Sequence, residues 1–422
     1  MNTIVEPRSH EGKKSLEPEM RFIEYDKSWN NITLGKAFTF LNGYAFSSLD
    51  SVKNGVRWVK IADVGIQEMK ENSVSFLPLE LKEKHEKFVL KTNDYVIALT
   101  RPILNGKLKI ARINEAYNGA LLNQRVGKLE TNQNQSFIYY LLQNSWLIDR
   151  IEKNIFGNEP PNLSINQISG LSVKIPELSE QQKIADFLSS VDKKIEQLTE
   201  KHSLLTEYKK GVMQQIFTQQ IRFKDNQGND YPQWEESNIG AICSFLKDGT
   251  HGTHQDEEGS KFFLLSAKNL KNGRLSTTDN ERRISENEFH KIYQNYNLQK
   301  GDVLLSVVGT IGEVLLWEGH PNIAFQRSVA FFRFKNQVPS FMVQLFQNTD
   351  FQRELKRRQV VSAQPGIYLG DLSKIILRLP SENEQQKIAN FLTEIDQKID
   401  QAWSILEQTK AFKKGLLQKM FV

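Results

Sequence analysis

The chain has 422 residues, of which 39% are hydrophobic and 25% are charged, so it has the composition of a soluble globular protein and is too long for one ordinary domain. Its net charge is +5, from 55 basic and 50 acidic residues, and so small an excess is only weak support for a polyanionic partner. No apolar run approaches the ~18 residues of a membrane span, and the single cysteine, Cys243, excludes an internal disulfide, so we expect a cytoplasmic protein without a membrane partner.

Residues 1–20 are polar and follow no periodic pattern, which predicts a disordered tail. Between residues 21 and 174, short runs rich in β-branched and aromatic residues, such as Val56–Val64 and Asp94–Leu99, are separated by Asn-Gly turns. A helical pattern follows at Ser136–Asn154, and a further strand ends at Pro176. We therefore expect an α+β domain over residues 21–174.

The next segment, residues 175–221, contains the pattern of one long helix at Glu180–Phe217. Its apolar residues recur in steps of three and four, which is the heptad spacing that lets two helices wind together. The expected pairing seam consists of Ile184, Leu188, Val191, Ile195 and Leu198. Ser179 with Gln182 forms a candidate capping box at the start. About 38 residues at about 1.5 Å each make a rod of roughly 57 Å.

The same plan then repeats. A second α+β domain is expected over residues 222–378, and residues 379–422 end in a second long helix, Glu384–Phe421, that matches the first at a constant offset of 204. Asn383 takes the matching cap position, and the second seam consists of Ile388, Leu392, Ile395, Ile399 and Leu406. A lone helix cannot bury such an apolar stripe. The sequence therefore predicts an α+β protein in which two domains alternate with two long helices that pair as an antiparallel coiled coil, a pseudo-twofold internal repeat. The alternative is that each helix is amphipathic and packs only on its own domain.

The two α+β domains share framework residues but have diverged between them. Trp29 reappears as Trp234, and Leu122–Arg125 matches Ala324–Arg327. The offsets drift by a few residues, so the loops differ in length. Helices that pair with each other must keep a seam, whereas domains that bind two different targets must differ at the residues that contact them.

At this point the sequence resembles the specificity subunit of type I restriction-modification systems. The residues that carry the resemblance are Pro-x-x-x-Glu-Gln-Gln-Lys-Ile-Ala-x-Phe-Leu, at Pro176–Leu188 and again at Pro380–Leu392, and a Lys-Lys-Gly at 209–211 and 413–415. The resemblance implies that each domain reads one half of a bipartite, asymmetric DNA target. It also implies that the helices set the spacing between the half-sites and dock methyltransferase subunits. The implied partners are double-stranded DNA, two methyltransferase (modification) subunits and restriction/translocase subunits, and the chain itself would have no catalytic residues.

Basic and amide side chains near predicted turns are our candidates for DNA contact, because Arg and Lys pair with guanine or phosphate and Asn pairs with adenine. In the first domain they are Asn42, Tyr44, Arg57, Lys60, Arg101, Asn105, Lys107 and Arg125. In the second domain they are Lys247, Thr250, His251, His254, Lys268, Asn269, Arg274, Arg282, Arg283 and Arg327. For any one of them the alternative is a solvated charge or a turn residue. The Gln-Arg pairs at 124–125 and 326–327 match between the domains, which favours a scaffold role or a phosphate contact over base reading.

The sequence gives no support for a catalytic, metal or cofactor site. The segment Lys247–His254 resembles a loop in some domains of this family, and its two histidines lack a cysteine or acidic cluster at metal-ligand spacing. There is no phosphate-binding loop motif and no Asn-Pro-Pro-Tyr tetrapeptide of the kind that amino-methyltransferases use. We therefore expect no cofactor. The competing hypotheses are a non-catalytic coiled-coil assembly scaffold, which would show no preference among DNA sequences, and an enzyme that acts on nucleic acid.

Overall fold

The computed structural model describes residues 4–5, 17–71, 74–155, 160–360 and 365–422. The chain divides into two compact units, which are described separately: unit 1 is Met1–Leu198 with Ile405–Val422, and unit 2 is Thr199–Ser404. Most of the predicted disordered tail lies outside the described residues. Two described residues of this segment, Ile4–Val5 (β1), pair antiparallel with Arg21–Phe22 (β2). None of the helices that the structure describes has both the length and the apolarity to cross a membrane.

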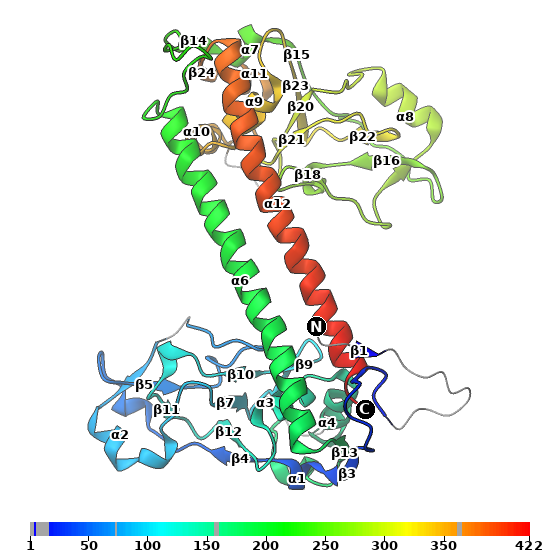
Figure 1. Cartoon of the computed structure of the whole chain (residues 1–422). Helices are drawn as coiled ribbons and strands as arrows, with labels where there is room; N and C mark the ends of the chain where they lie inside the picture. The colour runs from blue at the N-terminus through cyan, green and yellow to red at the C-terminus, as the bar shows by residue number, and fades with distance from the viewer. Residues whose placement is uncertain (1–3, 6–16, 72–73, 156–159, 361–364) are drawn as a thin grey trace. The chain divides into compact units, whose positions relative to one another are not determined.

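Unit 1 is built around a four-stranded antiparallel sheet in the order β10-β7-β12-β4 (Figure 1). A smaller sheet, β11-β5-β6, contains one parallel pair, β11 with β5, and β13 pairs with β3. The strands are β3 Asn30–Thr33, β4 Thr39–Asn42, β5 Val56–Val59, β6 Phe76–Leu77, β7 Tyr95–Ala98, β8 Ile103–Leu104, β9 Lys107–Leu108, β10 Ile110–Arg112, β11 Leu121–Leu122, β12 Val126–Glu130 and β13 Ser172–Ile175. The helices of the domain are α1 Leu34–Ala37, α2 Glu80–Lys84, α3 Gln135–Leu141, α4 Ser145–Ile155 and α5 Ile165–Ile168.

Unit 2 repeats the four-stranded sheet, the small sheet and the outer strand pair of unit 1, but its short two-stranded hairpin lies at a different point of the chain. Its four-stranded sheet has the order β21-β20-β23-β15, its small sheet is β22-β16-β19 with β22 parallel to β16, and β24 pairs with β14. The strands are β14 Glu235–Asn238, β15 Cys243–Asp248, β16 Phe262–Leu265, β17 Leu270–Lys271, β18 Arg274–Leu275, β19 Arg283–Ile284, β20 Val303–Ser306, β21 Val314–Leu316, β22 Ile323–Phe325, β23 Val329–Phe334 and β24 Ile376–Leu379. The helices are α7 Ile239–Ile242, α8 Glu286–Tyr293, α9 Pro339–Gln347, α10 Thr349–Arg357 and α11 Leu369–Ser373. The predicted repeat of an α+β domain is therefore confirmed.

Each of the two repeated helical segments forms one long helix. The helix α6 spans Leu178–Phe217, 40 residues, and α12 spans Glu382–Lys419, 38 residues. Both begin slightly before the predicted caps, so the capping prediction is wrong. Ser179 lies inside α6, where its hydroxyl donates to the Glu177 carboxylate instead of capping the helix. Asn383 likewise lies inside α12.

Each unit contains part of both long helices in its core. In unit 1 the seam residues Ile184, Leu188 and Val191 of α6 are buried in one cluster with Leu416 of α12 and with Met420, which directly follows that helix. Ile195 packs half-buried against that cluster, and Leu198 and Leu406 are also buried. The Lys413 ammonium contacts the Asp192 carboxylate at 2.7 Å. Unit 1 therefore joins the first half of α6 to the last turns of α12.

Unit 2 has the reciprocal arrangement. Ile388, Leu392 and Ile395 of α12 are buried with Met213 and Ile216 of α6, and Ile399 packs half-buried against them. The Lys209 ammonium lies 2.6 Å from the Asp396 carboxylate, and the rings of His202 and Trp403 are 5.3 Å apart. A step of seven residues forward along α6, from 202 to 209, matches a step of seven residues back along α12, from 403 to 396. Within unit 2 the two segments therefore run in opposite directions.

A buried glutamate ties the start of each long helix to its domain. In unit 1 the Arg21 guanidinium donates to both oxygens of Glu180, at 2.7 and 2.8 Å, and the Trp29 indole N–H donates to the same carboxylate. In unit 2 Arg222 and Trp234 contact Glu384 in the same way. Both glutamates lie in the first turn, where the positive end of the helix dipole also favours a carboxylate.

Candidate nucleic-acid interface

A glycine in each domain brings two loops into backbone contact. A Cβ on Gly43, which follows β4, would lie 2.2 Å from the carbonyl oxygen of Leu122, and a Cβ on Gly249, which follows β15, would lie 2.2 Å from that of Phe325. Only glycine fits such a close approach. The loop after β4 is thereby pressed against the loop between β11 and β12, and the loop after β15 against the loop between β22 and β23.

The backbone hydrogen bonds at this crossing fix which residues of the two domains are equivalent. The Gln124 N–H donates to the Tyr44 carbonyl at 2.9 Å, and the Arg327 N–H donates to the Thr250 carbonyl at 3.0 Å. Tyr44 is therefore equivalent to Thr250, and Gln124 to Arg327. The match made from sequence, which paired Arg125 with Arg327, is therefore wrong by one residue. A sequence comparison aligns the two identical Gln-Arg pairs, although the loops that contain them differ in length.

In unit 1 four loop segments meet, and we call the surface that they form the loop surface of the first domain. Besides the contact of Gln124 with Tyr44, the Leu99 N–H donates to the Arg125 carbonyl at 2.9 Å, and the Arg101 N–H donates to the Pro161 carbonyl at 2.8 Å. The candidates Asn42, Tyr44, Arg101 and Arg125 are exposed on this surface. The Tyr44 ring lies 4.0 Å from the ring of His85, so it presents a supported aromatic face of the kind that stacks on bases.

Two other candidates of the first domain are held within the domain. The Arg57 guanidinium lies 4.1 Å from the centre of the Tyr117 ring and donates to the Ala116 carbonyl. The Lys60 ammonium lies 4.3 Å from the Trp58 ring and contacts the Ser75 hydroxyl at 2.9 Å. These contacts give both cations a structural role.

Asn105 and Lys107 lie at the β8–β9 turn. Asn105 and Gly106 both have positive φ, 51° and 68°, as the predicted Asn-Gly turn requires. Lys107 is exposed and lines a cavity of about 590 Å³ within unit 1, together with Lys413 and Lys414 of α12.

In the second domain the histidines belong to a hydrogen-bonded loop. The His254 ring contacts the Thr250 hydroxyl at 2.8 Å on one side and the Glu288 carboxylate on the other, while His251 contacts Asp248 at 2.9 Å. Within the described ranges no three His, Cys, Asp or Glu side chains come together as metal ligands would. The histidines therefore order the loop that carries Thr250.

The basic candidates of the second domain divide by their partners. Those with a partner are Lys247 with the Asn295 carbonyl, Lys268 with Glu281, Arg274 with Asp400, Arg282 with Asp256 and the His254 carbonyl, and Arg283 with the Ser260 carbonyl. Arg327 is exposed, and no hydrogen bond or ion pair engages its side chain among the described residues. It is therefore the candidate of this domain that is most available to a ligand.

Asn269 does not fit the prediction of a DNA contact. Its residue is 1% exposed, at the end of the short 3-10 helix Ala267–Asn269 (η4). Its side chain accepts from the Ser266 N–H at 3.0 Å and donates to the Ser276 carbonyl at 3.0 Å. A buried amide with both ends bonded caps a turn and cannot reach a base.

Sequence reasoning missed Lys109, which lies between β9 and β10 of the first domain. It is half-buried, and its pKa is lowered first by burial and then by the neighbouring charges of Lys70 and Arg101. No turn signal marked it, because it sits in a run of alternating residues that reads as strand. The fold alone brings these cations together.

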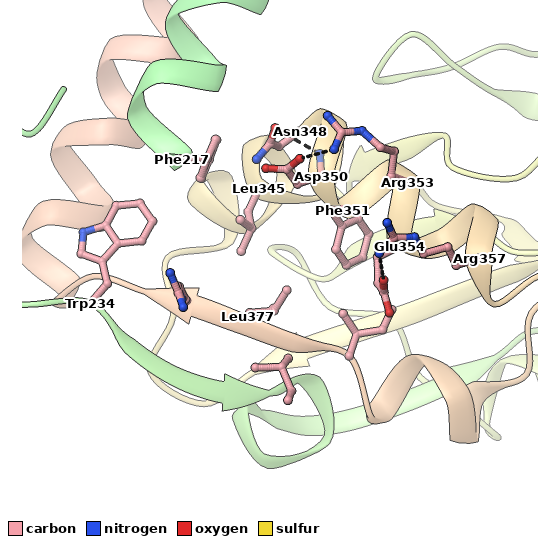
Figure 2. A pocket seen from close by; sticks show the side chains of 13 residues that line it. Phe217, Trp234, Leu345, Asn348, Asp350, Phe351, Arg353, Glu354, Arg357 and Leu377 are labelled. Atoms are coloured by element: carbon pink, nitrogen blue, oxygen red, sulfur yellow. Dashed lines mark hydrogen bonds and ion pairs between the residues drawn. The ribbon is translucent and has the colours of Figure 1, made fainter. Parts of the chain in front are cut away.

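The pocket in Figure 2 lies in unit 2, and its lining residues do not favour the binding of DNA or a cofactor. It has a volume of about 360 Å³ and is lined by one face of α10 together with Phe217 and Trp234. Two of its arginines are paired within α10, Arg353 with Asp350 at 3.0 Å and Arg357 with Glu354 at 3.6 Å. The third, Arg378 of β24, contacts Glu236 at 3.0 Å. Arginines that are already paired with carboxylates leave little charge for a ligand.

Both repeats of the chain match the same protein family. A family model described as the type I restriction modification DNA specificity domain matches residues 26–206 and again residues 231–409. The chain belongs to this family. Each match covers one α+β domain and most of the long helix that follows it. The family model therefore describes the same segment that is repeated within this chain.

Known specificity subunits are similar to this chain over different lengths. That of the type I restriction enzyme MjaVIII of Methanocaldococcus jannaschii is 30% identical over 205 residues, 48% of each chain. That of EcoBI of Escherichia coli is 23% identical over 393 residues, 87% of this chain and 79% of that subunit. The match to MjaVIII thus spans about half the length of that relative. The crystal structure of the type I restriction-modification S subunit from M. genitalium superposes with a TM-score of 0.60 at 17% identity, covering 96% of this chain and 99% of that one, and shows a shared fold.

Proposed function

We propose that this chain is the DNA specificity subunit of a type I restriction-modification complex, in which each α+β domain reads one half of a bipartite, asymmetric target. The observation that carries the proposal is the pair of loop surfaces on one repeated scaffold. The same glycine-mediated crossing presents Tyr44 in one domain and Thr250 in the other. Equal frameworks with unlike side chains at equivalent positions suit two readers of different sequences.

The two long helices set the distance between the half-sites as an antiparallel coiled coil. Support comes from reciprocal ion pairs: Asp192 with Lys413 in unit 1 and Asp396 with Lys209 in unit 2. Asp396 lies 204 positions after Asp192, and Lys413 lies 204 positions after Lys209. Each contact is therefore the repeat of the other, as a pseudo-twofold pairing requires.

The same helices dock the methyltransferase subunits, one for each repeat, and restriction/translocase subunits join through that complex. Aromatic residues at equivalent positions support two docking sites: Tyr208 is 53% exposed and Phe412, 204 positions later, is 52% exposed. Exposed aromatic residues are typical of protein interfaces. In this proposal the chain contributes recognition in the cytoplasm, and the chemistry belongs to its partners.

The test is to express the chain with its methyltransferase subunit and to map methylated adenines in the host DNA. The proposal predicts one motif made of two specified parts separated by a fixed unspecified gap. Methylation of a single uninterrupted motif would contradict the bipartite reading. Binding of the purified complex without preference among DNA sequences would instead support an assembly scaffold.

A further inference from the structure

Arg101 and Arg125 of the first domain's loop surface, and the neighbouring Lys109, have no cationic counterpart in the second domain. Backbone hydrogen bonds establish the equivalences. Arg101 N–H to Pro161 corresponds to Gly309 N–H to Pro365, and Leu99 N–H to Arg125 corresponds to Val307 N–H to Ser328. Ala98 N–H to Lys109 corresponds to Ser306 N–H to Glu313. Arg101, Arg125 and Lys109 thus stand where the second domain has glycine, serine and glutamate.

The replacements in the second domain serve its own backbone. The Ser328 hydroxyl accepts a hydrogen bond from the Ala267 N–H at 3.0 Å. The Glu313 carboxylate accepts one from the Asn272 N–H at 2.8 Å. These two side chains are engaged, and the second domain presents no positive charge at these three positions.

The backbone at Arg101 is unfavourable for an arginine. Its φ is +48°, and the equivalent Gly309 has φ +78°, so both domains use the left-handed region here. Glycine adopts that region without strain, whereas a residue with a Cβ does so at a cost. An arginine held in a conformation better suited to glycine suggests that its side chain has a function.

Arg101 and Lys109 line one cavity, and neither has a carboxylate partner within the described residues. The cavity, about 370 Å³, is lined by Arg101, Pro102, Ile103, Lys109 and Glu152, among others. Among the described residues, no ion pair or side-chain hydrogen bond engages Arg101, Lys109 or Lys70, and Glu152 pairs with none of them. The mutual repulsion of these charges, which contributes to the lowered pKa of Lys109, is relieved by an anion.

We propose that Arg101 and Lys109, with Arg125 beside them, bind a backbone phosphate of the half-site read by the first domain, and that the second domain has no phosphate contact at the equivalent place. The inference rests on the proposed function for the identity of the ligand as DNA. It makes the two halves of the protein unequal. The first domain holds its half-site partly through a salt-sensitive contact that carries no sequence information.

The first test replaces the two cations by uncharged residues in the complex with its methyltransferase. R101G introduces the residue that the second domain has at the equivalent position, Gly309, and removes the backbone strain. K109Q removes only the charge. The dissociation constant for a duplex that carries the methylated motif is measured between about 50 and 200 mM salt. Each lost phosphate contact lowers the slope of log K against log salt by about 0.9, so we expect the double variant to lose about one unit while the methylated motif stays the same.

The matched control is K36Q, which removes an exposed lysine on α1 that is not among the loop-surface residues. Its slope is expected to equal that of the unchanged protein, and thermal unfolding of all variants checks that the fold is intact. A double variant whose slope equals that of K36Q would overturn the phosphate site. A phosphate contact also strengthens binding to non-specific DNA, so the slope measured on a random duplex tests the phosphate site separately. An absence of sequence preference would contradict the proposed function but would leave this test of the phosphate site valid.

The second test locates the phosphate. Single uncharged methylphosphonates are placed in turn along the target duplex. We expect the unchanged complex to lose affinity at one or two positions within a single half-site, and the double variant to lose nothing further at those positions. Equal sensitivity of the double variant and the unchanged complex at every position would contradict the inference.

Discussion

At the residue scale, the loop surfaces depend on glycines that admit no side chain. In G249A the new Cβ would overlap the carbonyl oxygens of Phe325 and Gln326, at 2.2 and 2.3 Å, and both are backbone atoms that cannot rotate away. We expect a loss of stability of about 1–3 kcal/mol, which is typical of overpacking, together with weaker DNA binding. Chemical denaturation and binding assays measure the two effects.

The matched control for that variant is G370A in α11. Nothing lies within 4 Å of a Cβ there, and the backbone of Gly370 has no positive φ. The substitution is expected to be neutral or slightly stabilising. If G249A were as stable as G370A and bound DNA as well, the close approach of the two loops would not be what shapes this surface.

The single cysteine gives a second prediction at this scale. Burial raises the pKa of the Cys243 thiol to about 12 from its usual 9.0. The folded thiol is therefore almost un-ionised at pH 8, and we expect it to react with a thiol reagent roughly a thousandfold more slowly than in the unfolded chain. Because the folded pKa is the higher one, this thiol's contribution to stability is complete below pH 9 and is lost as the pH rises towards 12. Equal reaction rates for folded and unfolded chains would contradict the burial of this thiol, and C243A serves as the blank.

The candidate residues show what sequence could and could not predict at this scale. Tyr44, Arg101 and Arg125 could be chosen because exposed turn residues with suitable chemistry are visible in sequence. Asn269 misled because an amide that caps a turn has the same local signature as one that reads a base. Lys109 was missed because its neighbours Lys70 and Arg101 come to it only through the fold.

At the element scale, the long helices were predictable because their apolar residues repeat every three or four positions and no proline interrupts them. Their starts were not. Gln181 N–H donates to the Glu177 carbonyl, and Gln385 N–H donates to the Ser381 carbonyl, so each helix is already formed before the expected cap. A capping motif is a local signal, and here the first turn is held from outside by Arg21 and Arg222 through the buried glutamates.

If the long helices act as a spacer, their length determines the length of the gap between the two half-sites. Inserting four helix-forming residues after Thr199 in α6, and four after Ile405 in α12, lengthens the rod by about 6 Å. At about 3.4 Å per base pair, the gap in the methylated motif should grow by about two base pairs while both half-sites stay the same.

A loop insertion of equal size controls for the added length. Four residues after Thr277, in an exposed segment of the second domain, should leave the gap unchanged. A helix insertion that changed the bases of a half-site, or left the gap as it was, would show that the helices do not set the spacing.

At the scale of the whole molecule, the repeat was visible in sequence because the offset of 204 never slips along the helices. The compact units were not, since a linear division at residues 174, 221 and 378 assigns each helix as a whole. In the structure each unit takes part of both helices: α6 changes unit after Leu198, and α12 changes unit after Ser404. Such sharing follows from burial of two amphipathic stripes against each other and against the domains, which no single stretch of sequence records.

The central claim, that two unlike domains on one repeated frame each read half of the target, is tested most directly by exchanging one of them. Residues 222–378 are replaced by the corresponding domain of the EcoBI subunit, and the methylated motif is mapped beside that of the unchanged protein. The account predicts that one half of the motif is replaced while the other half and the gap are retained. A chimera that is active but alters both halves, or neither, would contradict it.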